Sequence, residues 1–190
     1  MTEPPRSRTM SILTGIFRIA RGRADGILQF GETRHAFLSS LAPLIAFPLV
    51  ASLLRLTSGE GLGAIDDLLA MICALLAPPV LSNELARFWG KEAAWARYAT
   101  AFNWCQWVLP MVGSIMLVVL GMAMAGGLAQ RTASEMFFLG LGGYGLWLHW
   151  FLVRKGLSLS VGRSVLFVIC VNFATIVLAV GPRLLAIDRG

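Results

Sequence analysis

The most conspicuous feature of the sequence is a series of long apolar runs separated by short polar segments. Five runs carry no charged residue, and they lie at Ala36–Leu54, Leu68–Asn83, Trp104–Ala125, Met136–Val153 and Ser164–Pro182. A transmembrane helix needs about 20 predominantly apolar residues. The pattern therefore predicts an all-α, polytopic transmembrane helical bundle with about five spans. The second span is the weakest of the five, because its uncharged run is short.

Prolines interrupt two of the predicted spans. Pro43 and Pro48 lie inside the first span and predict a kinked helix, because proline removes a backbone hydrogen bond and its ring displaces the preceding turn. Pro78 and Pro79 are adjacent in the second span and delete two amide donors. We expect the second span to be a broken helix.

A further apolar periodicity precedes the first span. At 100° per residue one face collects seven apolar side chains, which are Leu13, Ile16, Phe17, Ala20, Ala24, Ile27 and Leu28. This spacing predicts an amphipathic helix. Such a helix lies either on an anionic membrane surface or on the protein's own cytoplasmic loops. The sequence then divides into an N-terminal cytoplasmic segment (1–35), a five-span membrane domain (36–183) and a short external tail (184–190).

Composition strengthens the membrane assignment. Apolar residues make up 57% of the 190 residues and charged residues only 14%, where soluble domains have about 25% charged residues. A soluble fold of this size has too little interior for so much apolar surface, so the excess faces lipid. The small charged fraction also leaves few groups for a proton or ion relay inside the membrane.

The distribution of basic residues predicts the orientation of the chain. Alternate loops together carry twelve of the sixteen basic residues, and the intervening loops carry four. Basic loops stay in the cytoplasm, which places the N-terminus in the cytoplasm and the C-terminus in the periplasm of a bacterial inner membrane. The tryptophans agree, since all six lie near the predicted cytoplasmic ends, at Trp89, Trp95, Trp104, Trp107, Trp147 and Trp150.

This placement of charge also limits the classes of molecule that the protein is expected to bind. The net charge of +6 is accounted for by topology and by anionic lipid headgroups at the cytoplasmic face. No segment is large enough for a soluble basic face, so nucleic acid is excluded. The expected partners are the lipid bilayer and either another membrane protein or a second copy of the chain.

Two histidines are the only candidates for cofactor ligands. His35 opens the first span and His149 lies near the charged end of the fourth. Histidines from different helices can ligate a haem. The simpler interpretation is an interfacial His149 that bonds to headgroups or water. No cofactor is expected, and the isolated Cys73, Cys105 and Cys170 have no metal-site spacing.

Uncharged polar residues inside the spans are the next candidates. Asn103 and Gln106 open the third span, and Asn172 is the deepest polar residue of the fifth. Intramembrane polar groups usually face the interior of a bundle. Their commoner role is an interhelical hydrogen bond, and the alternative is a site for a transported solute.

Two carboxylates stand at the outer start of the second span. Asp66 and Asp67 suit a helix N-terminus, where the backbone dipole favours negative charge. Alternatively they form a cation or proton entry site leading to Pro78 and Pro79, because broken helices mark many transport sites. The chain carries no recognised catalytic motif, and we do not expect an enzyme.

The segment Asn83-Glu84-Leu85-Ala86-Arg87-Phe88-Trp89-Gly90-Lys91, between the second and third spans, resembles the short basic, glycine-containing stretch of the Yip1 family in its bacterial branch. The five-span layout with a cytoplasmic N-terminus is also similar. The resemblance covers about residues 10–185. It rests on this layout and on Gly143-Tyr144-Gly145, which is similar to a glycine-tyrosine motif of the family. It implies a non-enzymatic integral membrane protein and identifies no functional residue.

Three hypotheses about function follow. The first is an accessory or membrane-organising protein that acts through helix packing and cytoplasmic-side contacts. The second is a transporter or channel subunit, with a path lined by Asp66, Asp67, Pro78, Pro79 and Asn172. The third is a haem-carrying anchor subunit that uses His35 and His149. The scarcity of charge inside the spans favours the first.

Overall fold

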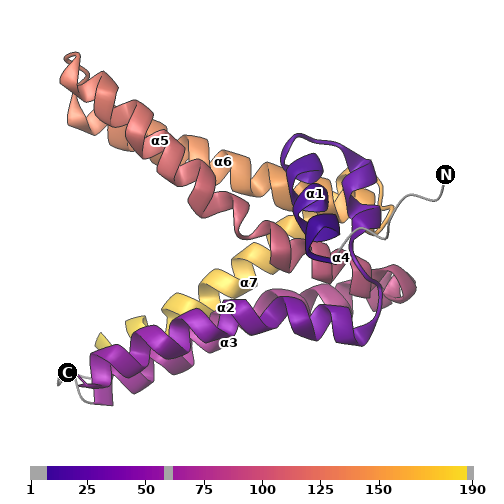
Figure 1. Ribbon diagram of the computed structural model, residues 1–190. Helices are drawn as coiled ribbons and strands as arrows, with labels where there is room; N and C mark the ends of the chain where they lie inside the picture. The colour runs from indigo at the N-terminus through magenta and orange to yellow at the C-terminus, as the bar shows by residue number, and fades with distance from the viewer. Residues whose placement is uncertain (1–7, 58–61, 188–190) are drawn as a thin grey trace.

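The computed structural model describes residues 8–57 and 62–187, and in these ranges every regular element is a helix (Figure 1). The elements are α1 (Arg8–Ala20), the 3-10 helix η1 (Ala24–Gln29), α2 (Arg34–Thr57), α3 (Leu62–Phe88), α4 (Glu92–Cys105), α5 (Val108–Ala125), α6 (Gln130–Gly156) and α7 (Val161–Ile187). Among the described residues, five stretches are long and apolar enough to cross a membrane, which are α2, α3, α4 with α5, α6 and α7. The predicted helical membrane fold is confirmed.

The helices form two arms that diverge from a shared base (Figure 1). The first arm consists of α2, α3 and α7, which pack side by side, and the second is the hairpin of α5 and α6. We use "base" for the region where the arms meet: α1, η1, α4 and the adjoining ends of α2, α3, α6 and α7. Helix α4 contacts α1, α2, α3 and α6 and therefore joins the two arms.

The base holds the densest packing of the molecule. Ile19, Tyr98, Leu152 and Phe167 come from four different helices, and each is at most 1% exposed. The rings of Tyr98 and Phe167 meet edge to face, with centroids 5.8 Å apart, a geometry that aromatic pairs favour. The base is thus a true protein core, built from both ends of the sequence.

The N-terminal helix is shorter than its periodicity predicts. Instead of continuing to Leu28, α1 ends at Ala20, and the chain reverses at Gly22, whose φ of +74° suits glycine. Element η1 then packs back on α1, so closely that a Cβ atom on Gly26 would lie 2.7 Å from the carbonyl oxygen of Gly15. The predicted N-terminal helix is therefore confirmed as far as Ala20, and beyond it the glycines permit a tight hairpin that a periodicity argument does not reveal.

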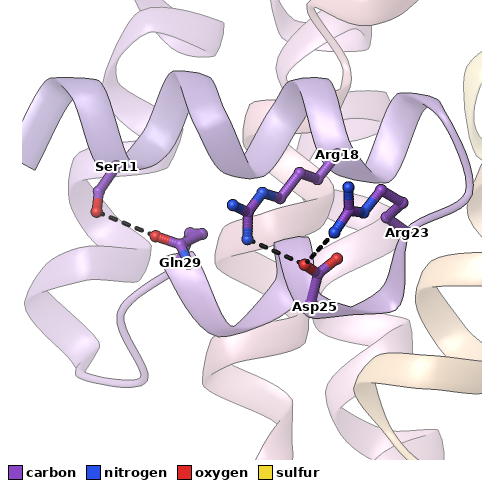
Figure 2. A network of polar contacts seen from close by, with 5 residues as sticks. All are labelled: Ser11, Arg18, Arg23, Asp25 and Gln29. Atoms are coloured by element: carbon purple, nitrogen blue, oxygen red, sulfur yellow. Dashed lines mark hydrogen bonds and ion pairs between the residues drawn. The ribbon is translucent and has the colours of Figure 1, made fainter.

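Polar contacts close this hairpin, as Figure 2 shows. Arg18 and Arg23 both donate to the carboxylate of Asp25, at 2.9 Å and 3.1 Å, and Ser11 donates to Gln29 at 3.3 Å. These side-chain contacts hold η1 against α1.

The α1–η1 hairpin lies against the rest of the protein. Ile12 and Ile16 pack on the core of the base, and the Tyr144 hydroxyl of α6 donates to the Ala20 carbonyl at 3.0 Å. Leu13 and Phe17 are more than half exposed. Packing on the protein, one of the two predicted alternatives, is therefore observed, and an apolar stripe remains on the outer side. Residues 8–30 therefore form part of the base.

Helix α3 runs without a break through Pro78 and Pro79. The predicted break is wrong, because each proline removes one hydrogen bond while the flanking bonds and the contacts with α2 and α7 maintain the helix. Helix α2 is likewise continuous through Pro43 and Pro48.

The interruption occurs in the third apolar run instead. Helix α4 ends at Cys105 and α5 begins at Val108. Pro110 has no N–H for the Gln106 carbonyl, and its ring would collide with that carbonyl in a regular helix. The carbonyl accepts a bond from Leu109 instead, at 3.3 Å. This turn directs α5 away from α4 and so begins the second arm.

Candidate functional site, a polar cavity where the arms meet

A cavity of about 410 Å³ lies between the base and the first arm. Residues of α2, α3, α4, α6 and α7 line it, together with the break between α4 and α5. Its lining is apolar with five polar side chains, which are Asn103, Gln106, His149, Asn172 and Thr175. Leu75 and Thr175, which also line it, stand close to the midpoints of α3 and α7. The cavity is therefore at middle depth in the spanning helices.

His149 is held by two neighbours on different helices. The Val168 carbonyl can only accept a hydrogen bond, so the amide nitrogen of Asn172 must face it, at 2.8 Å. The same nitrogen donates its second hydrogen to Nδ1 of His149, at 3.0 Å. Nε2 then carries the imidazole proton and donates it to the Tyr98 hydroxyl, at 3.2 Å. These bonds define one tautomer of His149.

The location of His149 differs from the simpler prediction. Rather than facing headgroups or water, its side chain is buried, and the ring of Phe102 lies 4.7 Å from it between centroids. Helix α4 crosses α6 at this level and covers it, a contact that the sequence of α6 alone does not reveal. The interhelical hydrogen bond predicted for Asn172 is confirmed.

Asn103 joins α4 to α2. The Ser40 hydroxyl donates to the Phe37 carbonyl at 2.6 Å, so its oxygen is left to accept. The Asn103 amide nitrogen therefore donates to Ser40, at 2.9 Å. Both side chains are buried, and their bond connects helices 63 residues apart in the sequence.

The side-chain amide of Gln106 also lines the cavity. It is half-buried at the α4–α5 break, and its side chain has no hydrogen-bond partner among the described residues. An unpaired amide in a membrane interior is unfavourable by a few kcal/mol, roughly, unless water or a ligand reaches it. Gln106 is therefore the side chain best placed to meet a molecule in the cavity.

Prolines add backbone acceptors to the same lining. A proline cannot donate to the carbonyl four residues before it. Pro48 therefore leaves the carbonyl of Leu44 without its usual backbone donor. Pro78 and Pro79 do the same to the carbonyls of Ala74 and Leu75. All three of these residues line the cavity. In membrane helices such carbonyls are tolerated where they face protein or a water-filled space.

A second cavity of about 380 Å³ continues toward the far end of the first arm. The two cavities share Met71 and Ala74 in their linings. The outer one also contains Arg55 of α2 and Asp67 of α3, whose side chains form an ion pair at 3.0 Å. Together the cavities extend from the middle of the arm to this ion pair.

The residues singled out on sequence largely converge here. Asn103, Gln106, His149, Asn172 and Pro78 line the central cavity, and Asp67 lines the outer one. Pro79 lines neither cavity, although it removes the usual backbone donor of Leu75, which lines the central one. Asp67 lies in the second turn of α3, where the membrane-spanning stretch begins as predicted, and it pairs with Arg55. The side chain of Asp66 lies outside the described part of the structure.

The two histidines do not form a haem site in this arrangement. Both ring nitrogens of His149 are hydrogen-bonded to protein groups, and His35 is exposed on the first turn of α2. Within the described residues no group of three or more histidine, cysteine, aspartate or glutamate side chains could hold a metal ion. The haem hypothesis has no support from the site.

Three residues of the site were missed on sequence. These are Ser40 and Tyr98, which pair with residues far along the chain, and Arg55, which pairs with Asp67. Arg55 and Asp67 flank the same short connection, which was a usable sign that they could pair. Ser40 and Tyr98 carried no comparable sign, because their roles depend on how α2, α4 and α6 cross.

No family model, curated protein or solved structure matches this chain. The similarity to the Yip1 family therefore stays a prediction.

Proposed function

We propose that this membrane protein binds a small polar solute in the central cavity and works as a transporter or channel subunit. The observation that carries the proposal is the gathering of polar side chains from α4, the α4–α5 break, α6 and α7 around one mid-depth cavity, whose lining also includes the residues of α2 and α3 that precede the prolines by four positions. Solute sites of transporters commonly lie near the bilayer midplane. The outer cavity supports it, because a solute needs a route to that depth.

The test is solute flux in proteoliposomes with a matched pair of variants. Stopped-flow light scattering after an osmotic step with glycerol or urea reports the rate of solute entry. Gln106→Leu removes the uncommitted amide and should slow entry by about five- to tenfold, the effect of one lost hydrogen bond. Gln130→Leu makes the same change at an exposed position outside the cavity and should leave the rate unchanged. Entry no faster than in protein-free vesicles contradicts the proposal.

The accessory role is a second candidate, and the exposed face of the α1–η1 hairpin favours it. Leu13, Phe17 and Leu28 are 57–68% exposed beside the exposed Arg21 and Arg23. Apolar side chains with arginines suit an anionic membrane surface. We place this face against the cytoplasmic leaflet of a bacterial inner membrane, with the N-terminus in the cytoplasm and the C-terminus in the periplasm.

Two measurements address this second role. A bimane probe on Leu13→Cys should shift to shorter emission wavelength in nanodiscs with anionic phosphatidylglycerol, compared with zwitterionic lipid. Crosslinking in native membranes should recover one specific protein partner or a second copy of the chain. Cysteines introduced at Arg131 and Arg154 should label from opposite sides, and labelling from one side contradicts the proposed topology.

A further inference from the structure

We infer that the central cavity selects solutes rich in hydrogen-bond donors, neutral or with a single positive charge, and rejects anions. This inference rests on the proposed function and specifies the chemical class of its solute. It follows from the balance of donors and acceptors that the protein itself leaves unused around the cavity.

The two asparagines leave both of their amide oxygens, and only one of their four amide hydrogens, available to a solute. The amide nitrogen of Asn172 donates both of its hydrogens, to Val168 and His149, and that of Asn103 donates one of its two to Ser40. Neither orientation can be reversed, because the Val168 carbonyl only accepts and the Ser40 hydroxyl already donates its hydrogen to Phe37. The Oδ1 atoms of both asparagines have no partner among the described residues.

The backbone adds further hydrogen-bond acceptors to the residues of the lining. The carbonyls of Leu44, Ala74 and Leu75 lack their usual amide donors, and all three residues line the cavity. Three separate prolines produce this result, two of them adjacent. The carbonyl dipoles present negative partial charge, as carbonyl rings do toward cations in channels.

Donors are scarce by comparison. The unused donors of the lining are the Gln106 amide and the second N–H of Asn103, and no charged side chain is part of the lining. An anion there would lose its hydration and meet mostly oxygen atoms. A neutral or singly cationic molecule with several N–H or O–H groups would instead satisfy acceptors that otherwise remain unpaired. The 410 Å³ volume is within the range of small-molecule sites.

The experiment measures tracer uptake of glycerol, guanidinium and methanesulfonate into proteoliposomes at pH 7. Guanidinium and methanesulfonate both stay charged at this pH, so neither crosses lipid as a neutral species. We expect glycerol and guanidinium to enter at least about tenfold faster than methanesulfonate, a difference equal to roughly one charge-assisted hydrogen bond.

A proline pair tests the backbone contribution. The double substitution Pro78→Ala with Pro79→Ala restores two N–H donors to the carbonyls of Ala74 and Leu75, and should slow glycerol uptake by about threefold or more. Pro43→Ala restores one such donor, to the carbonyl of Ser39, which is exposed and does not line the cavity, and should have no effect. Circular dichroism verifies that the helices persist.

The outcomes distinguish a failure of the proposed transport function from a failure of the proposed selectivity. Uptake of none of the three solutes above protein-free vesicles overturns the transport function itself. Methanesulfonate uptake that equals or exceeds that of glycerol and guanidinium, and that is lost in Gln106→Leu, keeps the function and overturns the selectivity. Equal effects of the two proline substitutions overturn the role of the carbonyls.

Discussion

The base and the arms have similar side chains in opposite environments. On α7, Phe167 is fully buried in the base, while Phe173, two turns further on, is 68% exposed in the arm. The base is held by protein packing, whereas the arms have one face on protein and the rest facing lipid. The cavity lies at this boundary. Its polar groups are positioned by the rigid base, and its route to the outside passes along the less tightly packed first arm.

The largest expected difference between base and arms concerns these two phenylalanines. Phe167→Ala should lower the free energy of unfolding by about 3–5 kcal/mol, because it leaves a cavity in a close-packed core. Phe173→Ala removes the same atoms from a lipid-facing position and should change it by less than about 1 kcal/mol. Unfolding in mixed detergent micelles measures both. Equal losses would show that the base is no better packed than the arms.

Glycines provide the next comparison. A Cβ on Gly26 would meet the Gly15 backbone at 2.7 Å, whereas nothing lies within 4 Å of one on Gly142 in the second arm. Gly26→Ala should destabilise the α1–η1 hairpin by about 1–3 kcal/mol through overpacking, and trypsin should then cut faster at Arg21 and Arg23. Gly142→Ala should stabilise its helix slightly. Unchanged proteolysis of Gly26→Ala contradicts the close contact.

Tyrosine substitutions test the His149 network. Tyr98→Phe leaves the Nε2 hydrogen of His149 without its acceptor and should lower the free energy of unfolding by about 1–2 kcal/mol. Tyr144→Phe also removes one hydroxyl, whose bond to Ala20 is half-buried, and should have an effect below about 1 kcal/mol. Nitrogen NMR of His149 should change only in Tyr98→Phe. A spectrum altered equally by both substitutions would remove the basis for the assigned tautomer.

The smallest effect on stability is expected at the arm tips. Arg55–Asp67 and Arg131–Glu135 are partly exposed ion pairs, each contributing less than about 1 kcal/mol. Asp67→Asn and Glu135→Gln should therefore be equally mild in unfolding experiments. Only Asp67 lines the outer cavity, so only Asp67→Asn should change the rate of glycerol entry. A rate that responds to neither substitution excludes a role for this ion pair in access.

Hydropathy was sufficient to predict the membrane-spanning helices, because each charged residue by itself makes it unfavourable to place a segment in lipid. It also pointed to Asn103, Gln106 and Asn172, since polar groups in a span need protein partners. The α1–η1 hairpin, the continuity of α3 and the burial of His149 could not be predicted in this way. They depend on close approach at Gly26, on packing of α3 against α2 and α7, and on the crossing of α4 over α6. Each is a contact between segments, which a pattern within one segment does not contain.

The central claim, a polar cavity at middle depth reached from the tip of the first arm, can be tested by cysteine accessibility. With Cys73, Cys105 and Cys170 replaced, Thr175→Cys places a thiol in the cavity lining, and Ile176→Cys places one at the same depth on a face that is 60% exposed to lipid. A charged, membrane-impermeant methanethiosulfonate reagent reacts with thiolates, which form in water and not in hydrocarbon. Added at the arm-tip side, it should modify Thr175→Cys at least about tenfold faster than Ile176→Cys. Equal rates, or faster modification of Ile176→Cys, would contradict the account.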